Sequence, residues 1–321
     1  MGMLVNGVWT DDDGARQGKD GSFQRVESQF REQVTADASS GLPAQAGRYH
    51  LYVAISCPWA HRTMIYRAIK GLEDAISMTL VGPAKQQHGW ELTGRGGAYP
   101  DVINGAHFLH EVYAKAKSGY TGRVTVPVLW DKQTGRIVNN ESPEIIRMLN
   151  SAFNAFAKRD VPDLYPLALR TEIDRWNELT YRTVNNGVYR AGFATSQERY
   201  EEAARGVFDT FDQIEARLAT QRYLCGRQIT EADWRLFPTL ARFDVAYHGH
   251  FKCNLRRLTD YPNLWAYTRD LYQQPGVAAT VDLDAIRNNY YGNQLQVNPS
   301  RVVAIGPKID FSAAHGRERL N

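Results

Sequence analysis

The sequence predicts an α/β domain followed by an all-helical domain, and three observations support this division. The chain has 321 residues, more than one hydrophobic core ordinarily organises. Strand-like and helix-like patterns alternate from residue 48 to about residue 155, and after residue 165 the apolar residues recur with helical spacing. Between the two regions lies KRDVPDLYP, whose Pro and Asp residues are typical of a linker. We therefore place the domains at residues 46–155 and 165–297.

The first domain has the predicted order strand, helix, strand, insertion, hairpin and helix. RYHLYVAIS from residue 48 becomes apolar, as a buried strand does, and CPWAHRTMIYRAIKGL follows as a helix. Pro58 suits the first helical position and Gly71 suits the end. A strand follows at residues 76–82, and then an insertion at residues 83–120 with a helix near residues 107–117. Two strands joined by a turn span residues 124–142, and a helix follows at residues 142–150. This order suits a thioredoxin-like α/β sandwich, although periodicity alone indicates only an α/β fold.

Four long segments of the second domain carry helix-spaced apolar residues, at residues 171–186, 196–220, 229–244 and 261–277. Thr230 followed by Asp233 resembles a capping box, with Asp in place of the usual Glu or Gln. Residues 1–45 are polar with weak periodicity, which predicts an irregular N-terminal extension wrapping the first domain. Residues 298–321 predict a loop-like C-terminal tail.

Composition excludes several classes of function. The net charge of +3 is spread along the chain, so we expect neither nucleic acid nor a membrane surface as a partner. No apolar run reaches the roughly 18 residues of a membrane helix, and the first residues lack the pattern of an export signal. Three sparse cysteines, without zinc-like spacing to histidine, predict reduced thiols in the cytoplasm and no metal site.

Cys57 is the predicted nucleophile. It ends a strand and opens a helix, where amide N–H groups and the helix dipole stabilise a thiolate. Such sites lower thiol pKa values to roughly 3.5–7.5. Most cysteines are small buried hydrophobic residues, and we prefer that interpretation for Cys225 and Cys253.

Ala60 occupies the second cysteine position of a CxxC motif, so Cys57 cannot form a disulfide within the motif. A mixed disulfide on Cys57 must therefore be resolved by an external thiol through thiol–disulfide exchange. Glutathione is the obvious cytosolic candidate. We accordingly predict glutathione as a co-substrate and no permanently bound cofactor.

Two further motifs fit a γ-glutamyl peptide. Val126-Pro127 lies in an apolar strand, either at a sheet edge or as a cis-Pro turn that exposes the Val126 amide and carbonyl. Glu141-Ser142-Pro143 predicts a helix start with Ser142 as N-cap. Its N–H groups can bind a carboxylate while Glu141 binds an ammonium group, although most capped helices bind no ligand.

The sequence as a whole resembles the glutathionyl-hydroquinone reductases, the Xi class of glutathione transferases. The resemblance rests on Cys57-Pro58-Trp59-Ala60 together with VTVPVLWD, NNES, NNGVYRAGF, ITEADWRLFPTLARFD, HFKCN, DYPNL, IRNNYYG and NPSRVVAIGP. It covers nearly the whole chain and implies the glutathione-transferase fold and a homodimer. One departure is Asn289, where the family is associated with His.

The resemblance also implies residue roles. Cys57 attacks the sulfur of a glutathionyl-hydroquinone, hydroquinone leaves, and a second glutathione releases oxidised glutathione. Tyr189 matches the proton donor or acceptor, and Tyr247 and Tyr290 match tyrosines that lower the cysteine pKa. The glutathione moiety is held by Trp90, by the Arg123, Val124, Thr125 and Val126 strand, and by Glu141 and Ser142.

Without the resemblance, we would assign Trp90 and the three tyrosines to packing, since the chain has 17 tyrosines. His61 and Arg62 can tune Cys57 electrostatically, but solvent or interdomain contacts are the simpler expectation. Two alternative functions stay open. One is an Omega-like thioltransferase or dehydroascorbate reductase, and the other is a non-catalytic binding scaffold of the same fold.

Overall fold

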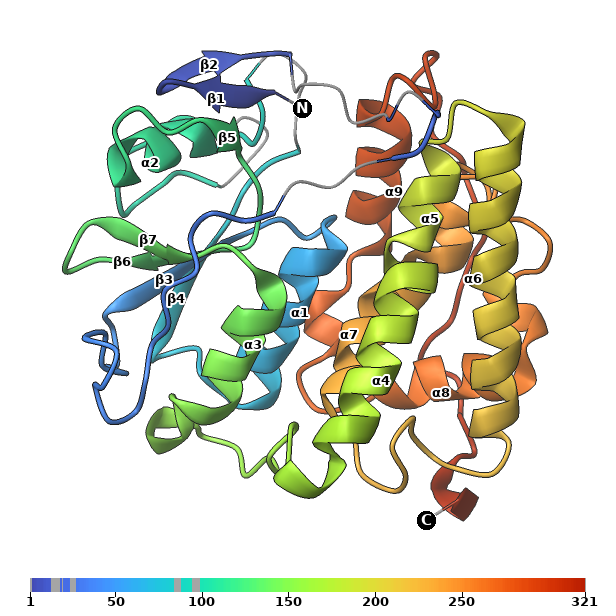
Figure 1. Cartoon of the computed structure of the whole chain (residues 1–321). Coiled ribbons are helices and arrows are strands. Elements are labelled where there is room, and N and C mark those ends of the chain that lie inside the picture. The colour runs from blue at the N-terminus through green and yellow to red at the C-terminus, as the bar shows by residue number, and fades with distance from the viewer. Residues whose placement is uncertain are drawn as a thin grey trace. The chain divides into compact units, whose positions relative to one another are not determined.

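The computed structural model describes residues 2–12, 18, 20–23, 27–83, 88–93 and 99–320. Contacts divide the chain into two compact units (Figure 1). The first unit comprises Met1–Arg16 and Arg25–Asp160, and the second comprises Gln17–Gln24 and Val161–Asn321. A short piece of the N-terminal extension therefore belongs to the second unit.

The first unit is built on a four-stranded sheet of order β4-β3-β6-β7. Its strands are β3 (Tyr49–Val53), β4 (Ile76–Leu80), β6 (Val128–Asp131) and β7 (Arg136–Asn139). β3 runs parallel to β4 and antiparallel to β6, which runs antiparallel to β7. Two helices, α1 (Pro58–Ile69) and α3 (Ser142–Ser151), pack together beside this sheet (Figure 1). The predicted order of strands and helices is confirmed.

Both predicted ends of α1 are also confirmed. Pro58 lies in the first turn, where its missing N–H costs no hydrogen bond. Gly71 follows the C-cap residue Lys70 with a φ of +65°, and the Leu72 amide donates to the Arg67 carbonyl. A left-handed glycine after the last turn ends the helix.

The N-terminal extension is not wholly irregular, so that expectation is wrong for its first residues. β1 (Met3–Val5) and β2 (Val8–Thr10) form a hairpin, and β1 also pairs with β5 (Gly122–Arg123). The reason is the two-residue turn Asn6-Gly7, whose φ values of 50° and 81° suit a tight hairpin. The predicted insertion contains α2 (Leu109–Ala116) as expected, while residues 84–87 and 94–98 of it lie outside the described residues.

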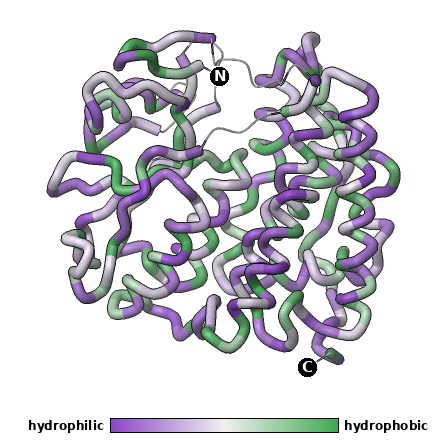
Figure 2. Tube along the Cα trace, viewed as in Figure 1, coloured by the Kyte–Doolittle hydropathy of each residue, from purple (hydrophilic) through white to green (hydrophobic). Residues whose placement is uncertain are grey.

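The second unit is helical, which confirms the predicted fold class. Its α-helices are α4 (Arg170–Thr180), α5 (Gly187–Gly192), α6 (Gln197–Leu218), α7 (Glu231–Arg242), α8 (Pro262–Tyr272) and α9 (Leu283–Asn293). Two π-helical segments, Tyr181–Asn185 and Phe243–Tyr247, continue α4 and α7. Short 3-10 helices occur in both units, at Asn154–Phe156, Leu167–Leu169, Leu258–Asp260, Ala278–Thr280 and Glu318–Leu320. Figure 2 shows the alternation of apolar and polar residues along these helices.

Three helix starts differ in how well the sequence predicts them. The Asp233 carboxylate accepts from the Thr230 amide at 2.7 Å and from its hydroxyl at 2.9 Å, so the residues of the capping box interact as predicted. α3 begins one residue earlier than predicted: Glu141 is its N-cap and Ser142 its first residue. The helix-spaced segments of the sequence do not include α9, although Asp282 caps it by accepting from the Ala285 amide at 2.8 Å.

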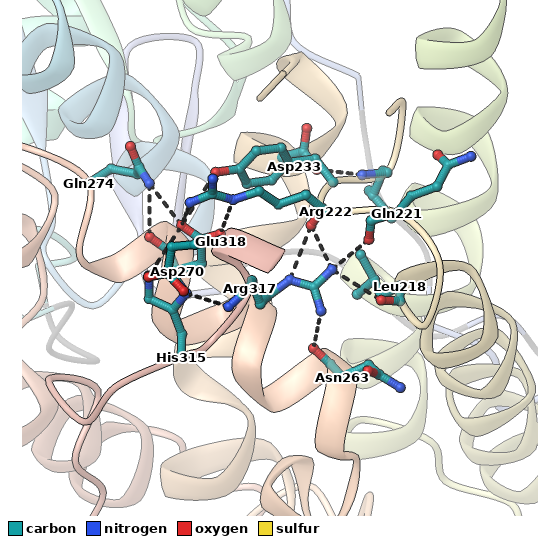
Figure 3. Close-up of polar contacts among 12 residues, drawn as sticks. Leu218, Gln221, Arg222, Asp233, Asn263, Asp270, Gln274, His315, Arg317 and Glu318 are labelled. Atoms are coloured by element: carbon teal, nitrogen blue, oxygen red, sulfur yellow. Dashed lines mark hydrogen bonds and ion pairs between the residues drawn. The ribbon is translucent and has the colours of Figure 1, made fainter. Parts of the chain in front are cut away.

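The C-terminal segment is anchored by a buried arginine. Arg317 is 2% exposed, and its guanidinium donates to backbone carbonyls of Leu218, Gln221, Arg222 and Asn263 (Figure 3). Leu218 is the last residue of α6, so the cation caps carbonyls at a helix C-terminus. Although residues 298–317 have no helix or strand, the end of the chain is thus part of the second unit. Within the described ranges, no helix is long and apolar enough to cross a membrane.

Candidate active site

Cys57 lies at the start of α1, as the sequence predicts. It is the N-cap residue, with extended backbone angles of −84° and 119°, and its side chain is only partly buried. Its carbonyl accepts from the His61 amide at 3.0 Å, so the helical hydrogen bonds begin there. The first turn of α1 carries no acidic side chain that would oppose a thiolate.

The Val126-Pro127 segment lies directly beside the thiol. The peptide bond is cis, and the Cys57 Sγ donates to the Val126 carbonyl at 3.6 Å. β6 begins only at Val128, so Pro127 precedes the strand and removes no ladder hydrogen bond. Among the described residues, the Val126 amide has no hydrogen-bond partner. Thus a backbone donor stands beside the nucleophile with no acceptor of its own.

Glu141 and Ser142 form the second part of this site, at the N-terminus of α3. The Glu141 carboxylate accepts from the Ser28 hydroxyl at 3.0 Å, and its amide donates to the Asn139 side chain at 2.7 Å. Ser142 is 2% exposed, and its amide finds no acceptor in the described part of the chain. A helix N-terminus with an unused amide beside a carboxylate suits a ligand that bears both charges.

His61 and Arg62 are not exposed to solvent, so the solvent half of that expectation is wrong, and the interdomain half stays a prediction. They are 0% and 1% exposed. The Arg62 guanidinium lies 4.6 Å from the centre of the Trp59 ring, and its Nη1 donates to the Ser142 hydroxyl at 3.4 Å. A buried cation therefore connects the cysteine helix to the start of α3. Its position in the first turns of α1 is visible in the sequence, but its contact with Ser142 depends on the fold.

Of the other predicted residues of the first unit, two are buried and two are partly exposed. Trp90 is 7% exposed, and its indole Nε1 has no acceptor among the described residues. Arg123 lies in β5 and is partly exposed, Val124 is 5% exposed, and the Thr125 amide donates to the Tyr113 hydroxyl at 3.3 Å. Sequence reasoning missed Ser28 and Tyr113, because neither belongs to a recognisable motif.

The second unit brings the three predicted tyrosines together. The Tyr290 hydroxyl shares one hydrogen bond with the Tyr189 hydroxyl, at 2.6 Å, and another with the Tyr247 hydroxyl, at 2.9 Å. The three residues come from α9, α5 and the π-helical segment Phe243–Tyr247. We call this set the tyrosine chain, with Tyr290 in its middle.

Burial keeps the Tyr247 and Tyr290 hydroxyls protonated. Tyr247 and Tyr290 are 0% and 2% exposed, and desolvation, followed by the neighbouring Tyr189, raises the pKa of both phenols well above the usual value of 10. Both therefore remain neutral donors through the physiological pH range. Phe251 lies 5.5 Å from Tyr247 and 5.4 Å from Tyr189, measured between ring centroids.

Gly192 permits this aromatic packing. A Cβ atom at Gly192 would lie 2.2 Å from the Phe251 ring, closer than any real contact, so a side chain there would displace Phe251. This explains the glycine in the GVYRAGF segment that carries Tyr189. No group of three or more His, Cys, Asp or Glu side chains suited to a metal ion occurs in the part of the chain that the structure describes.

Comparisons with known proteins agree with this architecture. The glutathione S-transferase N-terminal domain model matches residues 56–152, and the corresponding C-terminal domain model matches residues 197–270. Glutathionyl-hydroquinone reductase YqjG of Escherichia coli is 49% identical over 99% of both chains, and PcpF of Sphingobium chlorophenolicum is 50% identical over 96% of both.

Solved structures give the same relationship. The glutathione-bound structure of YqjG superposes with a TM-score of 0.90 at 47% identity, covering 99% of both chains. The Xi-class transferase of Natrialba magadii gives a TM-score of 0.93 at 46% identity, covering 100% of this chain and 97% of that one. The fold is that of the glutathione transferases, and the chain belongs to their Xi class, the enzyme family of the glutathionyl-hydroquinone reductases.

Proposed function

We propose that this enzyme uses glutathione to reduce glutathionyl-hydroquinones to hydroquinones, with Cys57 as nucleophile. The observation that carries the proposal is the position of Cys57 at the start of α1, beside the unused amide of Val126. The names of its full-length relatives supply the reaction class.

In the first step, the Cys57 thiolate attacks the sulfur of the glutathionyl-hydroquinone. A sulfur–sulfur bond forms and the carbon–sulfur bond breaks, and its electron pair stays on the aromatic carbon, which takes up a proton. Hydroquinone leaves, and Cys57 becomes a mixed disulfide with glutathione. A second glutathione thiolate then attacks this disulfide, which releases oxidised glutathione and regenerates the thiol.

Tyr189 is the proposed proton donor to the aromatic carbon. A phenol is a competent general acid when it is positioned at the reacting atom. Tyr189 is only partly buried, whereas its partner Tyr290 is almost fully buried, so Tyr189 is the more accessible of the two residues. Tyr247 and Tyr290 are the proposed residues that stabilise the thiolate, since hydrogen bonds to a charged form lower its pKa.

The glutathione moiety would occupy the first unit. Its cysteinyl backbone would pair with Val126, as an added strand pairs with a sheet edge. Its γ-glutamyl carboxylate would accept from the Ser142 amide and its ammonium group would bind Glu141. The buried indole N–H of Trp90 lacks an acceptor among the described residues, and a carboxylate of glutathione would provide one. Arg123, Val124 and Thr125 complete this proposed set.

Substitution of the cysteines tests the proposal. Cys57→Ala should abolish reduction of a glutathionyl-hydroquinone while retaining the fold, whereas Cys225→Ala and Cys253→Ala should keep most activity. Mass spectrometry of wild-type protein treated with substrate alone should show one added glutathione, on Cys57. Turnover by purified Cys57→Ala would refute the assignment. Dehydroascorbate and a small disulfide, assayed in parallel, test the Omega-like alternative.

We also propose a cytoplasmic homodimer. None of the three cysteines forms a disulfide, which fits a reducing compartment. The dimer rests on analogy with the family alone. Light scattering should give about twice the mass of the chain, and a monomer at micromolar concentration would contradict the dimer without affecting the chemistry.

A further inference from the structure

Tyr113, on α2, makes hydrogen bonds to two separate segments of the first unit, which are otherwise joined by a long contact of 3.5 Å from the Asn140 Nδ2 to the Thr125 hydroxyl. Its hydroxyl donates to the Thr125 carbonyl at 2.8 Å and accepts from the Thr125 amide at 3.3 Å. It also accepts from the Asn140 side-chain Nδ2 at 3.1 Å. A phenol hydroxyl has one donor and two acceptor positions, so every position is used.

The two connected segments are those proposed to hold glutathione. Thr125 directly precedes Val126, whose carbonyl contacts the thiol of Cys57. Asn140 directly precedes Glu141, at the start of α3. We infer that Tyr113 is a positioning residue that holds these two segments at the separation which glutathione binding requires. The inference rests on the proposed function.

Fixed aromatic neighbours separate the role of the hydroxyl from that of the ring. The Tyr113 ring packs edge-on against Phe30 at 5.7 Å and lies 5.4 Å from Tyr120, measured between centroids. Phenylalanine would preserve these contacts and would remove every hydrogen bond of the hydroxyl. Burial raises the pKa of Tyr113, so its hydroxyl keeps the proton that it donates to Thr125.

Loss of the hydroxyl should act on binding more than on chemistry. Without it, the Thr125 backbone and the Asn140 side chain lose a shared buried partner. Only the 3.5 Å bond from the Asn140 Nδ2 to the Thr125 hydroxyl then joins the two segments, so their separation is held less firmly and both can shift. Val126 and Glu141 would move with them. A ligand held at both ends is sensitive to such displacements, because its contacts depend on the separation of the two sites.

Tyr52 provides a matched control in the same unit. It is also fully buried, its hydroxyl donates to Asp101 at 2.8 Å, and it accepts from Asn104 at 2.9 Å. Tyr52→Phe therefore removes a comparable buried phenol, but its partners lie in the insertion and none of them adjoins Val126 or Glu141.

Glutathione binding to purified full-length variants, measured by titration calorimetry, tests the inference. Tyr113→Phe should raise the dissociation constant for glutathione about tenfold. The dissociation constant of Tyr52→Phe should stay within about twofold of wild type. In steady-state assays, Tyr113→Phe should raise the KM for glutathione and leave kcat nearly unchanged. Equal effects of the two substitutions on glutathione affinity would overturn the inference, since a general loss of stability would then suffice.

Asn140→Ala keeps the test available if Tyr113→Phe does not fold. It removes the hydrogen bond between the Asn140 side chain and the Tyr113 hydroxyl and should also weaken glutathione binding. Wild-type glutathione affinity in this variant would count against the inference. Where both variants fold, their effects should be non-additive in the double variant, because they act on one shared hydrogen bond. A wild-type enzyme that does not bind glutathione would instead refute the proposed function itself.

Discussion

The tyrosine chain allows stability and catalysis to be separated by three equivalent substitutions. Tyr290→Phe removes both hydrogen bonds, at 2.6 and 2.9 Å, and deprives the fully buried Tyr247 hydroxyl of this partner. Each lost hydrogen bond costs about 1 kcal/mol, and a buried hydroxyl deprived of its partner costs a further 1–3 kcal/mol, roughly. We expect Tyr290→Phe to lower the free energy of unfolding by about 3 kcal/mol. Tyr247→Phe removes one bond and should cost about half as much.

Tyr189→Phe should give the opposite pattern. Tyr189 is partly exposed, so the loss of its hydroxyl should reduce stability least of the three. If it delivers the proton to the departing aromatic carbon, the hydroquinone-forming step should slow by roughly 100-fold or more. The thiol pKa of Cys57 should stay nearly unchanged in this variant, because the proposed contacts to the thiolate come from Tyr247 and Tyr290.

Urea denaturation, single-turnover kinetics and pH-dependent alkylation of Cys57 measure these three effects. If Tyr247 or Tyr290 contacts the thiolate, its replacement by Phe should raise the pKa of the Cys57 thiol. A rise of one pKa unit corresponds to about 1.4 kcal/mol of lost thiolate stabilisation. Tyr267→Phe is the matched control: its buried hydroxyl donates to Asp233 at 2.7 Å, outside the tyrosine chain, so this variant should lose stability and keep activity. Wild-type turnover and alkylation in all three chain variants would refute the proposed roles and leave packing as the function of these residues.

Other buried groups give three independent predictions. At about pH 7.5, a thiol reagent should modify Cys57 alone. Burial raises the pKa of Cys225 and Cys253 to about 12, so fewer than roughly one in 10,000 of these thiols are ionised. Labelling of either residue comparable to that of Cys57, detected by mass spectrometry, would contradict this prediction. Burial lowers the pKa of His50 to about 4, so its contribution to stability is complete above about pH 6.5 and about 3 kcal/mol is lost as the pH falls through 4; His50→Gln should flatten the urea-denaturation profile across this range. Arg317→Met should lower the free energy of unfolding by about 3 kcal/mol, because several buried carbonyls lose their donor, and an unchanged melting temperature would show that water replaces the guanidinium.

Local chemistry explains which parts of the fold the sequence could predict. Pro58 and Gly71 bound α1 because proline suits a first turn and a left-handed glycine suits a last one. The Asn6-Gly7 hairpin could also have been predicted, since this dipeptide is a strong hairpin signal. The polar residues around it favour an irregular segment instead. α3 begins one residue before the predicted position, because Pro143 suits the first turn but occupies its second position and not its first.

The tyrosine chain was not predictable from local pattern. Its members lie 58 and 43 residues apart in the sequence, and nothing distinguishes them there from the other tyrosines of a chain that has 17. Their roles came from the family resemblance, and their hydrogen bonds came from the fold. The same holds for Tyr113, whose partners Thr125 and Asn140 are brought together only when β6 and β7 pair.

The two π-helical segments account for part of this arrangement. In each of them an amide donates to the carbonyl five residues earlier, from Asn186 to Tyr181 at 2.9 Å and from His248 to Phe243 at 2.8 Å. The extra residue changes the direction of all later side chains relative to the preceding α-helix, and such segments often occur at functional sites. Tyr247 ends one π-helical segment, and Tyr189 lies in the helix that follows the other. Without the extra residue, Tyr189, which follows the first π-helical segment, would be rotated by about 100° about its helix axis. The first π-helical turn therefore helps to set the direction of Tyr189, whose hydroxyl reaches Tyr290, and helix-spaced sequence patterns could not reveal it.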